Sequence, residues 1–465
     1  MSASDAATAT EDLRSRIRGG VVGPGDEGYD EARTVYNAMH DRRPGAVVRP
    51  TDDADVMAAL GWATEHDLPV AVRGGGHSVP GYGTCDHGLV LDLSRMRSVR
   101  IDPDARRARV GGGAILGDLD HAAYPYGLAT PAGFFSTTGV GGLTLGGGIS
   151  AYLGRKHGLT CDNLVSADVI AADGTRVTAS EDRNSELFWA LRGGGGNFGV
   201  VTSFEFELHP LEDVVGGPIF FELEGAGDLM RFYRDYIKEA PRDLGGFMGF
   251  HVAPPLPFIP EDRHGDTLFA VVASWSGDPD DADDVLGPIR AAGSVVAEHV
   301  GRVPYFALQS AFDALIPPGL QHYWKSDFVD ELTDAAIEAH VEHGSRVPNV
   351  TSTMHLYPMD GAPQEVDPDA TAFGYRDADF SVNIVGAWED ATGTDEHVAW
   401  VRDYYDAIHP HSGYEGGYTN FMAADDQARV RENYGPAYER LARLKAEWDP
   451  ENRFRFNQNV EPGGR

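Results

Sequence analysis

The chain has 465 residues, of which 42% are hydrophobic and 10% are aromatic. Disordered chains are poor in these residues, so the composition predicts a folded protein of about two to four domains. Lys plus Arg total 38 and Asp plus Glu total 72, which gives a formal net charge of −34. Phosphate backbones and anionic lipid surfaces would be repelled, so we expect neither nucleic acid nor a membrane as partner.

Basic charge is carried almost entirely by arginine, because the chain has only four lysines: Lys156, Lys238, Lys325 and Lys445. An acidic excess destabilises a compact protein by self-repulsion, and high salt screens that repulsion. We therefore expect a halophilic cytoplasmic protein; an ordinary acidic, soluble enzyme is the alternative. No stretch reaches the roughly 18 apolar residues of a membrane span, and residues 1–20 lack the apolar core of a secretory signal.

Apolar periodicity predicts the first elements in chain order. A helix is expected over residues 54–66, and strands are expected at 68–72, 89–93, 108–110 and 168–172. Short strands that alternate with helices indicate an α/β or α+β domain.

The composition changes near residues 209–218. Strand-like runs at 268–274 and 380–385 then alternate with longer helical patterns, which predicts an antiparallel sheet covered by helices. A helix is expected over residues 429–448, ended by Asp449 and Pro450.

Glycine is concentrated in four runs of the first half: 74–76, 111–113, 146–148 and 193–196. Such turns let a ligand approach the backbone and expose amides that bind anions, so they suggest a phosphate-bearing cofactor. A glycine-rich turn is nevertheless more often only a turn, and no P-loop or Rossmann fingerprint is present. The two cysteines form no CxxC pair, and no metal-ligand spacing such as HExxH occurs.

The run from Arg73 to Gly83, RGGGHSVPGYG, resembles the flavin-attachment loop of FAD-linked oxidases with a PCMH-type FAD-binding domain. Within that vanillyl-alcohol-oxidase superfamily the chain resembles the berberine-bridge-enzyme-like branch. Segments at 28–44, 139–164, 187–201 and 418–459 resemble the family's opening, its second and third FAD loops and its C-terminal signature, in the family's order.

The resemblance implies an α+β architecture with FAD as cofactor. Residues 1–212 would form the PCMH-type FAD-binding domain and 213–417 an antiparallel-sheet substrate domain covered by helices. Residues 418–465 would return to the FAD domain, and the isoalloxazine ring would lie at the junction.

The resemblance also implies that His77 bonds covalently to the 8α-methyl carbon of the flavin; a histidine that only forms hydrogen bonds is the alternative. Many members use a cysteine as a second anchor, where this chain has Phe135, so a single histidyl bond is expected. Leu143 replaces a frequent histidine. Thr138 lies where the family tunes oxygen access, which leaves oxidase and dehydrogenase both open. The remaining implied FAD contacts are Arg73, Gly74, Gly75, Gly76, Ser78, Gly81, Gly139, Gly141, Gly142, Asn197, Gly199, Val201, Asn457 and Asn459.

Tyr418 matches the tyrosine of the family's Tyr-x-Asn-Phe/Tyr signature and is the expected catalytic base. A free phenol has a pKa near 10, so a nearby cation or hydrogen-bond donor must lower it. A core tyrosine with a satisfied hydroxyl is the alternative. Tyr152, His157 and Arg376 are further pocket candidates.

Together these features predict an oxidoreductase that moves a hydride from a small-molecule substrate to flavin N5, with reoxidation by O2 or another acceptor. A sugar or another secondary alcohol would need a base. An amine, as in a hydroxynicotine-oxidase-like protein, would need none. A flavin-binding protein without turnover remains a third possibility.

Overall fold

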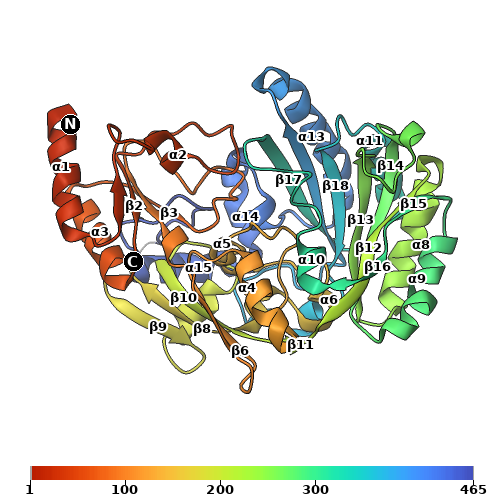
Figure 1. Cartoon of the computed structure of the whole chain (residues 1–465), viewed down its shortest axis with the longest axis horizontal. Helices are drawn as coiled ribbons and strands as arrows, with labels where there is room; N and C mark the ends of the chain where they lie inside the picture. The colour runs from red at the N-terminus through yellow and green to blue at the C-terminus, as the bar shows by residue number, and fades with distance from the viewer. Residues whose placement is uncertain (1–2, 464–465) are drawn as a thin grey trace.

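In the computed structural model, which describes residues 3–463, the chain forms three main sheets with helices packed around them (Figure 1). The two smaller sheets use residues 20–207 and lie at one end of the molecule. An eight-stranded sheet drawn from residues 213–388 forms the other end. The C-terminal segment crosses back to the first end, where it lies near α1 (Ala3–Arg16).

The first sheet is mixed, with strand order β1-β2-β4-β3. Its strands are β1 (Gly20–Val22), β2 (Ala46–Arg49), β3 (Val70–Arg73) and β4 (Leu89–Asp92). Helices α2 (Tyr29–Arg33) and α3 (Asp53–Glu65) accompany it. Asp52 caps α3 by accepting a hydrogen bond from the Asp55 amide at 3.0 Å. The predicted helix at 54–66 and the strands at 68–72 and 89–93 are confirmed to within two residues. The first glycine run follows β3 directly.

The second sheet is antiparallel, with strand order β5-β6-β10-β8-β9. Its strands are β5 (Val99–Asp102), β6 (Arg107–Gly111), β8 (Leu164–Ile170), β9 (Arg176–Ser180) and β10 (Val200–Glu207). The strand predicted at 108–110 is confirmed as β6, whereas the one predicted at 168–172 is the end of a strand that begins earlier. Around it lie α4 (Leu116–Ala123), α5 (Val140–Leu145), α7 (Ser185–Leu191) and a ribbon of β7 (Leu128–Ala129) with β11 (His209–Pro210), whereas α6 (Gly154–His157) lies against the third sheet.

The third sheet is antiparallel, with strand order β15-β12-β14-β13-β18-β19-β17, and β16 also pairs with β12. Its strands are β12 (Asp213–Phe221), β13 (Leu244–Val252), β14 (Thr267–Trp275), β15 (Val295–Glu298), β16 (Gly301–Pro304), β17 (Gln321–Val329), β18 (Thr353–Pro358) and β19 (Phe380–Trp388). Both strands predicted in this region are confirmed as β14 and β19. The accompanying helices are α8 (Ala226–Glu239), α9 (Ala282–Ala291), α10 (Tyr305–Gln309), α11 (Asp334–Gly344), α12 (Ala362–Glu365) and α13 (Thr394–Ile408).

The two faces of the third sheet differ because side chains alternate along a strand. Met354 and Leu356 of β18 are buried in the core that α8, α9, α11 and α13 cover. The alternate residues Thr353, His355 and Tyr357 line a cavity at the junction with the glycine-rich end. The sheet thus has one purely structural face and one face available to a ligand.

The single helix predicted over 429–448 is wrong. The structure has α14 (Val430–Tyr434), a 3-10 turn at Gly435–Ala437 and α15 (Tyr438–Trp448). Gly435 adopts a positive φ of 51°, and Pro436 has no amide proton to continue a helix. The break lets α15 turn onto α7, where Leu441 shares a core with Phe188.

Ion pairs lie both in the interior and at the surface of the protein. Lys445 and Asp449 are 2.7 Å apart with both side chains fully buried, and Lys325 lies 2.6 Å from buried Asp426. Other pairs are partly exposed, as in Arg263 with Glu222. Exposed pairs of this kind contribute little stability each, so they do not compensate for the acidic excess.

We expect the melting temperature to rise as KCl increases from about 0.1 M to molar levels, because the screening length falls from roughly 10 Å to roughly 3 Å. Salt should have this effect because it screens the self-repulsion that comes from the net charge of −34. Differential scanning fluorimetry across a KCl series measures this directly, with sucrose at matched osmolality as control. A flat or falling melting temperature contradicts salt adaptation.

Among residues 3–463, no helix is both long and apolar enough to span a membrane.

Candidate active site

A large cavity lies where the glycine-rich end meets the eight-stranded sheet. One side is lined by backbone from the first, second and fourth glycine-rich segments, and the other by β17, β18 and β19. The C-terminal segment contributes the loop 418–421 and residues 454 and 456–458. The cavity therefore draws on both ends of the sequence and on its middle.

Two glycine loops touch one another at the cavity wall, which explains why they carry no side chains. A Cβ atom at Gly75 would lie 2.3 Å from the Gly139 nitrogen, and one at Gly139 would lie 2.2 Å from the Gly75 nitrogen. Real Cβ atoms do not approach backbone this closely, so any substitution would push the loops apart. Gly76 adds a positive φ of 73°, which favours glycine.

Most residues that the resemblance implied as FAD contacts line this cavity. They are Arg73, Gly74, Gly75, Gly76, His77, Ser78, Gly139, Gly141, Gly142, Gly199, Val201 and Asn457. The other three, Gly81, Asn197 and Asn459, do not line the cavity. Gly81 instead packs against His40. The Asn197 amide donates to the Gly194 carbonyl at 2.8 Å and ties a glycine loop to the C-terminal segment.

His77 lies in the turn after β3 and is held from two sides. Its ring stacks on Tyr36 with centroids 4.0 Å apart, and Nε2 lies 2.9 Å from the Thr137 hydroxyl. Nδ1 takes part in no hydrogen bond described for the chain. Burial lowers the pKa of His77 to about 4, so the imidazole is neutral at physiological pH and can act as a nucleophile.

The place expected for a second covalent anchor holds an apolar ring. Phe135 lines the cavity, as do Thr138 and Leu143. Cys85 and Cys161 are both buried and neither lines the cavity. Burial raises the pKa of the Cys85 thiol to about 11, which leaves it unreactive.

Tyr418 presents its hydroxyl oxygen to three N–H donors. The Gly148 and Ile149 amides donate at 2.9 and 3.3 Å, and the Asn420 amide donates at 2.8 Å. These donors favour the phenolate, but burial outweighs them and raises the pKa of Tyr418 to about 12. The sequence-based expectation of nearby donors is met, whereas the expected lowering of the pKa is wrong. Gly146 leaves the room that Asn420 needs, since a Cβ there would lie 2.2 Å from its Oδ1.

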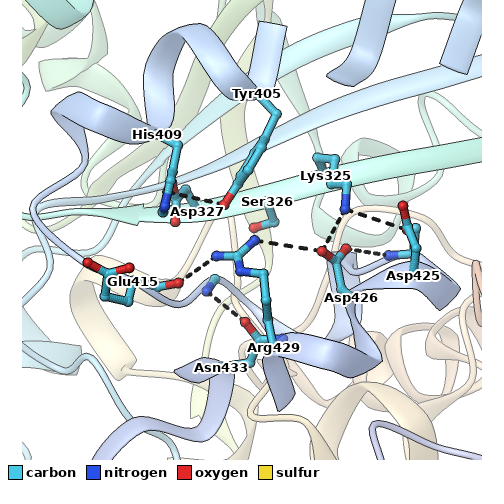
Figure 2. A network of polar contacts seen from close by, with 12 residues as sticks. Lys325, Ser326, Asp327, Tyr405, His409, Glu415, Asp425, Asp426, Arg429 and Asn433 are labelled. Atoms are coloured by element: carbon cyan, nitrogen blue, oxygen red, sulfur yellow. Dashed lines mark hydrogen bonds and ion pairs between the residues drawn. The ribbon is translucent and has the colours of Figure 1, made fainter. Parts of the chain in front are cut away.

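The loop that carries Tyr418 is anchored to β17 by a buried polar network (Figure 2). Lys325 pairs with Asp426 at 2.6 Å, and Asp327 pairs with His409 at 2.6 Å. The Gly417 amide donates to Asn433 at 3.4 Å. Burial raises the pKa of Asp327 to about 6, while the bond to this carboxylate raises the pKa of His409. Ionic contacts on both sides thus fix the position of the tyrosine loop.

The three further pocket candidates do not line the cavity. Tyr152 is buried in a neighbouring apolar cluster. His157 stacks on His209 at 3.8 Å. Arg376 pairs with Asp162 at 2.6 Å. Their polar groups and their closeness to FAD-loop motifs suggested a pocket, but the side chains turn into the protein interior.

Several cavity residues were missed because the middle of the chain carries no motif. They are Trp324 of β17, Thr353, His355 and Tyr357 of β18, and Asn383 of β19. The sequence did contain one signal for these residues, the alternation of polar with apolar residues along a buried strand in Thr353-Met-His355-Leu-Tyr357.

The polar groups and glycine loops that line the cavity are chemically suited to bind FAD. Asn457 Oδ1 and both amide atoms of Gln458 are buried and have no hydrogen-bond partner within the described chain, although both residues line the cavity. Buried polar groups are normally paired, so these amides suit the polar edge of an isoalloxazine ring. The glycine loops supply the close backbone approach that a pyrophosphate requires.

Comparisons with known proteins agree with this geometry. A family model described as an FAD binding domain matches residues 44–180, and one described as berberine and berberine like matches residues 417–461. The chain is 32% identical over 459 residues to the uncharacterized FAD-linked oxidoreductase YgaK of Bacillus subtilis, covering 97% of this chain and 98% of that one.

It is also 32% identical over 465 residues to (R)-6-hydroxynicotine oxidase of Paenarthrobacter nicotinovorans, covering 96% and 98% of the two chains. The crystal structure of 6-hydroxy-D-nicotine oxidase from Arthrobacter nicotinovorans superposes with a TM-score of 0.85 at 30% identity, over 96% of this chain and 98% of that chain. The protein is therefore an FAD-dependent enzyme that belongs to the berberine-bridge-enzyme-like branch of the FAD-linked oxidoreductases, with a PCMH-type FAD-binding domain and an antiparallel-sheet α+β architecture.

Proposed function

We propose that the enzyme oxidises a small-molecule alcohol, a sugar or another secondary alcohol, with O2 or another molecule as final electron acceptor. FAD, when bound, supplies the hydride acceptor N5. The single observation that carries the proposal is the position of Tyr418, whose hydroxyl enters the cavity wall beside the glycine loop 146–148. Oxidation of an alcohol also releases a proton from oxygen, and Tyr418 is the group placed to accept it.

The three N–H donors give Tyr418 its chemical role. Hydrogen-bond donors stabilise a phenolate, and the two backbone amides and the Asn420 amide supply them. Fixed donors of this kind stabilise negative charge without rearranging during the reaction. Because the pKa is about 12, the phenolate is the minor form at neutral pH.

A second candidate is oxidation of an amine. The raised pKa of Tyr418 favours it, because hydride can leave a neutral amine without a base. The similarity to a protein named (R)-6-hydroxynicotine oxidase supports it as well.

We also propose that FAD is held by a single covalent bond to His77, supported by its neutral imidazole and by Phe135 at the second position. In this proposal residues 1–212 and 418–465 form the FAD-binding domain and residues 213–417 the substrate domain.

An anaerobic screen of flavin absorbance tests the function. Sugars, secondary alcohols and amines are added separately to the oxidised holoenzyme, and dithionite serves as positive control. We expect bleaching by a member of the alcohol class. Bleaching by amines alone replaces the alcohol proposal with the amine candidate. A flavin that only dithionite reduces contradicts both.

A further inference from the structure

We propose that the substrate is an uncharged aromatic molecule and that the side-chain amide of Asn383 binds its polar group. This inference rests on the proposed function and selects within it an aromatic secondary alcohol over a sugar, since it concerns the part of the cavity that the flavin leaves open. That part is the side formed by β17, β18, β19 and the aromatic residues opposite them.

The first argument is the lack of charge in the cavity. The chain has 38 basic and 72 acidic residues, yet among the described lining residues only Arg73 carries a fixed charge. Its guanidinium is already occupied by Asp92 and the Thr34 carbonyl, each at 3.0 Å. The lining histidines His77 and His355 are neutral, because burial lowers both pKa values. An ionic substrate would be desolvated here without a counter-charge, which is strongly unfavourable. The attraction of a cation to aromatic rings is smaller than this desolvation cost and does not offset it.

The second argument is the aromatic character of the walls. Phe134 lies 4.8 Å from Phe135 and 5.9 Å from Tyr357, measured between ring centroids. Phe421 lies 5.8 Å from Tyr357 and 6.1 Å from Trp324. All five rings line the cavity, and they come from separate parts of the chain. The Phe421–Trp324 pair is edge-to-face and the other three pairs are tilted, all at centroid distances within the range of aromatic contacts, so a planar aromatic substrate can join the array.

The third argument is an unpartnered amide. Asn383 is 2% exposed and lines the cavity, and its side chain takes part in no hydrogen bond described for the chain. In the sheet it stands opposite His355, whose Nδ1 bonds to the Tyr357 hydroxyl at 2.7 Å, while Nε2 has no partner among residues 3–463. A buried amide without hydrogen-bond partners lowers the stability of the folded protein, and a bound ligand that supplies those hydrogen bonds removes this cost.

Ser381 supplies an internal comparison. It lies two residues before Asn383, on the same face of β19, and its buried hydroxyl is likewise unpartnered. It does not line the cavity, however. A buried polar group without a hydrogen-bond partner therefore does not by itself indicate a binding site. Asn383 does so because it also lines the cavity.

The experiment titrates the oxidised holoenzyme with three inert probes that share a phenyl ring and differ in charge: benzamide, benzoate and benzyltrimethylammonium. Binding is followed by the shift of the flavin absorbance spectrum and, independently of flavin, by quenching of tryptophan fluorescence, since Trp324 lines the cavity. We expect benzamide to bind at least about tenfold more tightly than either ion.

Three variants then test the amide. Asn383→Leu should weaken benzamide binding by about tenfold, the loss of one buried hydrogen bond, whereas Ser381→Ala should leave it unchanged. Asn383→Asp keeps the shape and adds a negative charge, so it should shift preference toward benzyltrimethylammonium. If Asn383→Leu does not fold, the probe preference of Asn383→Asp still tests the role of Asn383.

Equal or tighter binding of either ion to the wild type overturns the inference, as does the absence of binding by all three probes. Unchanged benzamide affinity in Asn383→Leu, or an unchanged probe preference in Asn383→Asp, overturns the role of Asn383. Failure of the proposed function is seen separately, as a protein without flavin or with flavin that no substrate reduces.

Discussion

Replacement of His77 by alanine is expected to free FAD completely from the denatured protein, while the wild-type flavin stays attached. The neutral imidazole, stacked on Tyr36 and held by Thr137, is the nucleophile that the cavity presents beside the first glycine run. Proteins are precipitated with acid, and the yellow colour is compared between pellet and supernatant.

His157→Ala is the matched control, because His157 is also half-buried and stacked but lies outside the cavity. Its flavin should remain in the pellet. Peptide mass spectrometry should find one FAD adduct, on the peptide with His77, and none on Cys85 or Cys161. Quantitative release of flavin from the wild type contradicts covalent attachment, and a cysteinyl adduct contradicts only the single bond.

Tyr418→Phe should slow flavin reduction by an alcohol substrate about 10²- to 10⁴-fold, the usual contribution of a general base. The flavin should stay bound, because His77 is on a different element. Anaerobic stopped-flow absorbance gives the rate constant directly. Tyr375→Phe is the control: this hydroxyl donates to the Glu432 carbonyl and lies outside the cavity, so reduction should keep its wild-type rate.

The pH dependence of the rate of flavin reduction is a second measurement of the role of Tyr418. With a pKa of about 12, the reactive phenolate fraction grows about tenfold per pH unit over the neutral and alkaline range. Reduction by an alcohol should therefore accelerate with pH, and Tyr418→Phe should abolish the acceleration. With an amine, the rate should level off at the pKa of the amine and should not depend on Tyr418.

The cofactor side of the cavity could be anticipated from the sequence because its residues are close in the chain. The strand ending at Arg73 and the glycine run behind it are a local pattern, and backbone conformation follows from glycine itself. A local signal was also present at Gly435 and Pro436, because a Gly-Pro pair interrupts a helix even where the apolar periodicity continues through it.

The substrate side could not be anticipated. Trp324, His355 and Asn383 meet only because β17, β19 and β18 are neighbours in the sheet, and strand order across such separations is set by long-range packing. Alternation identifies the two faces of each strand, but not what lies opposite them. The pKa of Tyr418 also depends on burial by distant segments, which a motif does not report.

The return of the C-terminal segment has a consequence for biosynthesis. Lys445 donates to the Asn197 carbonyl at 2.8 Å and to the Phe454 carbonyl at 2.8 Å, and Asn457 and Gln458 complete the cavity wall. Domains generally fold from the N-terminus as the ribosome delivers the chain, but this site lacks one wall until residues 457 and 458 have been synthesised. Flavin loading must then wait for this segment, and chains truncated before it would remain apoprotein even with every glycine loop already made.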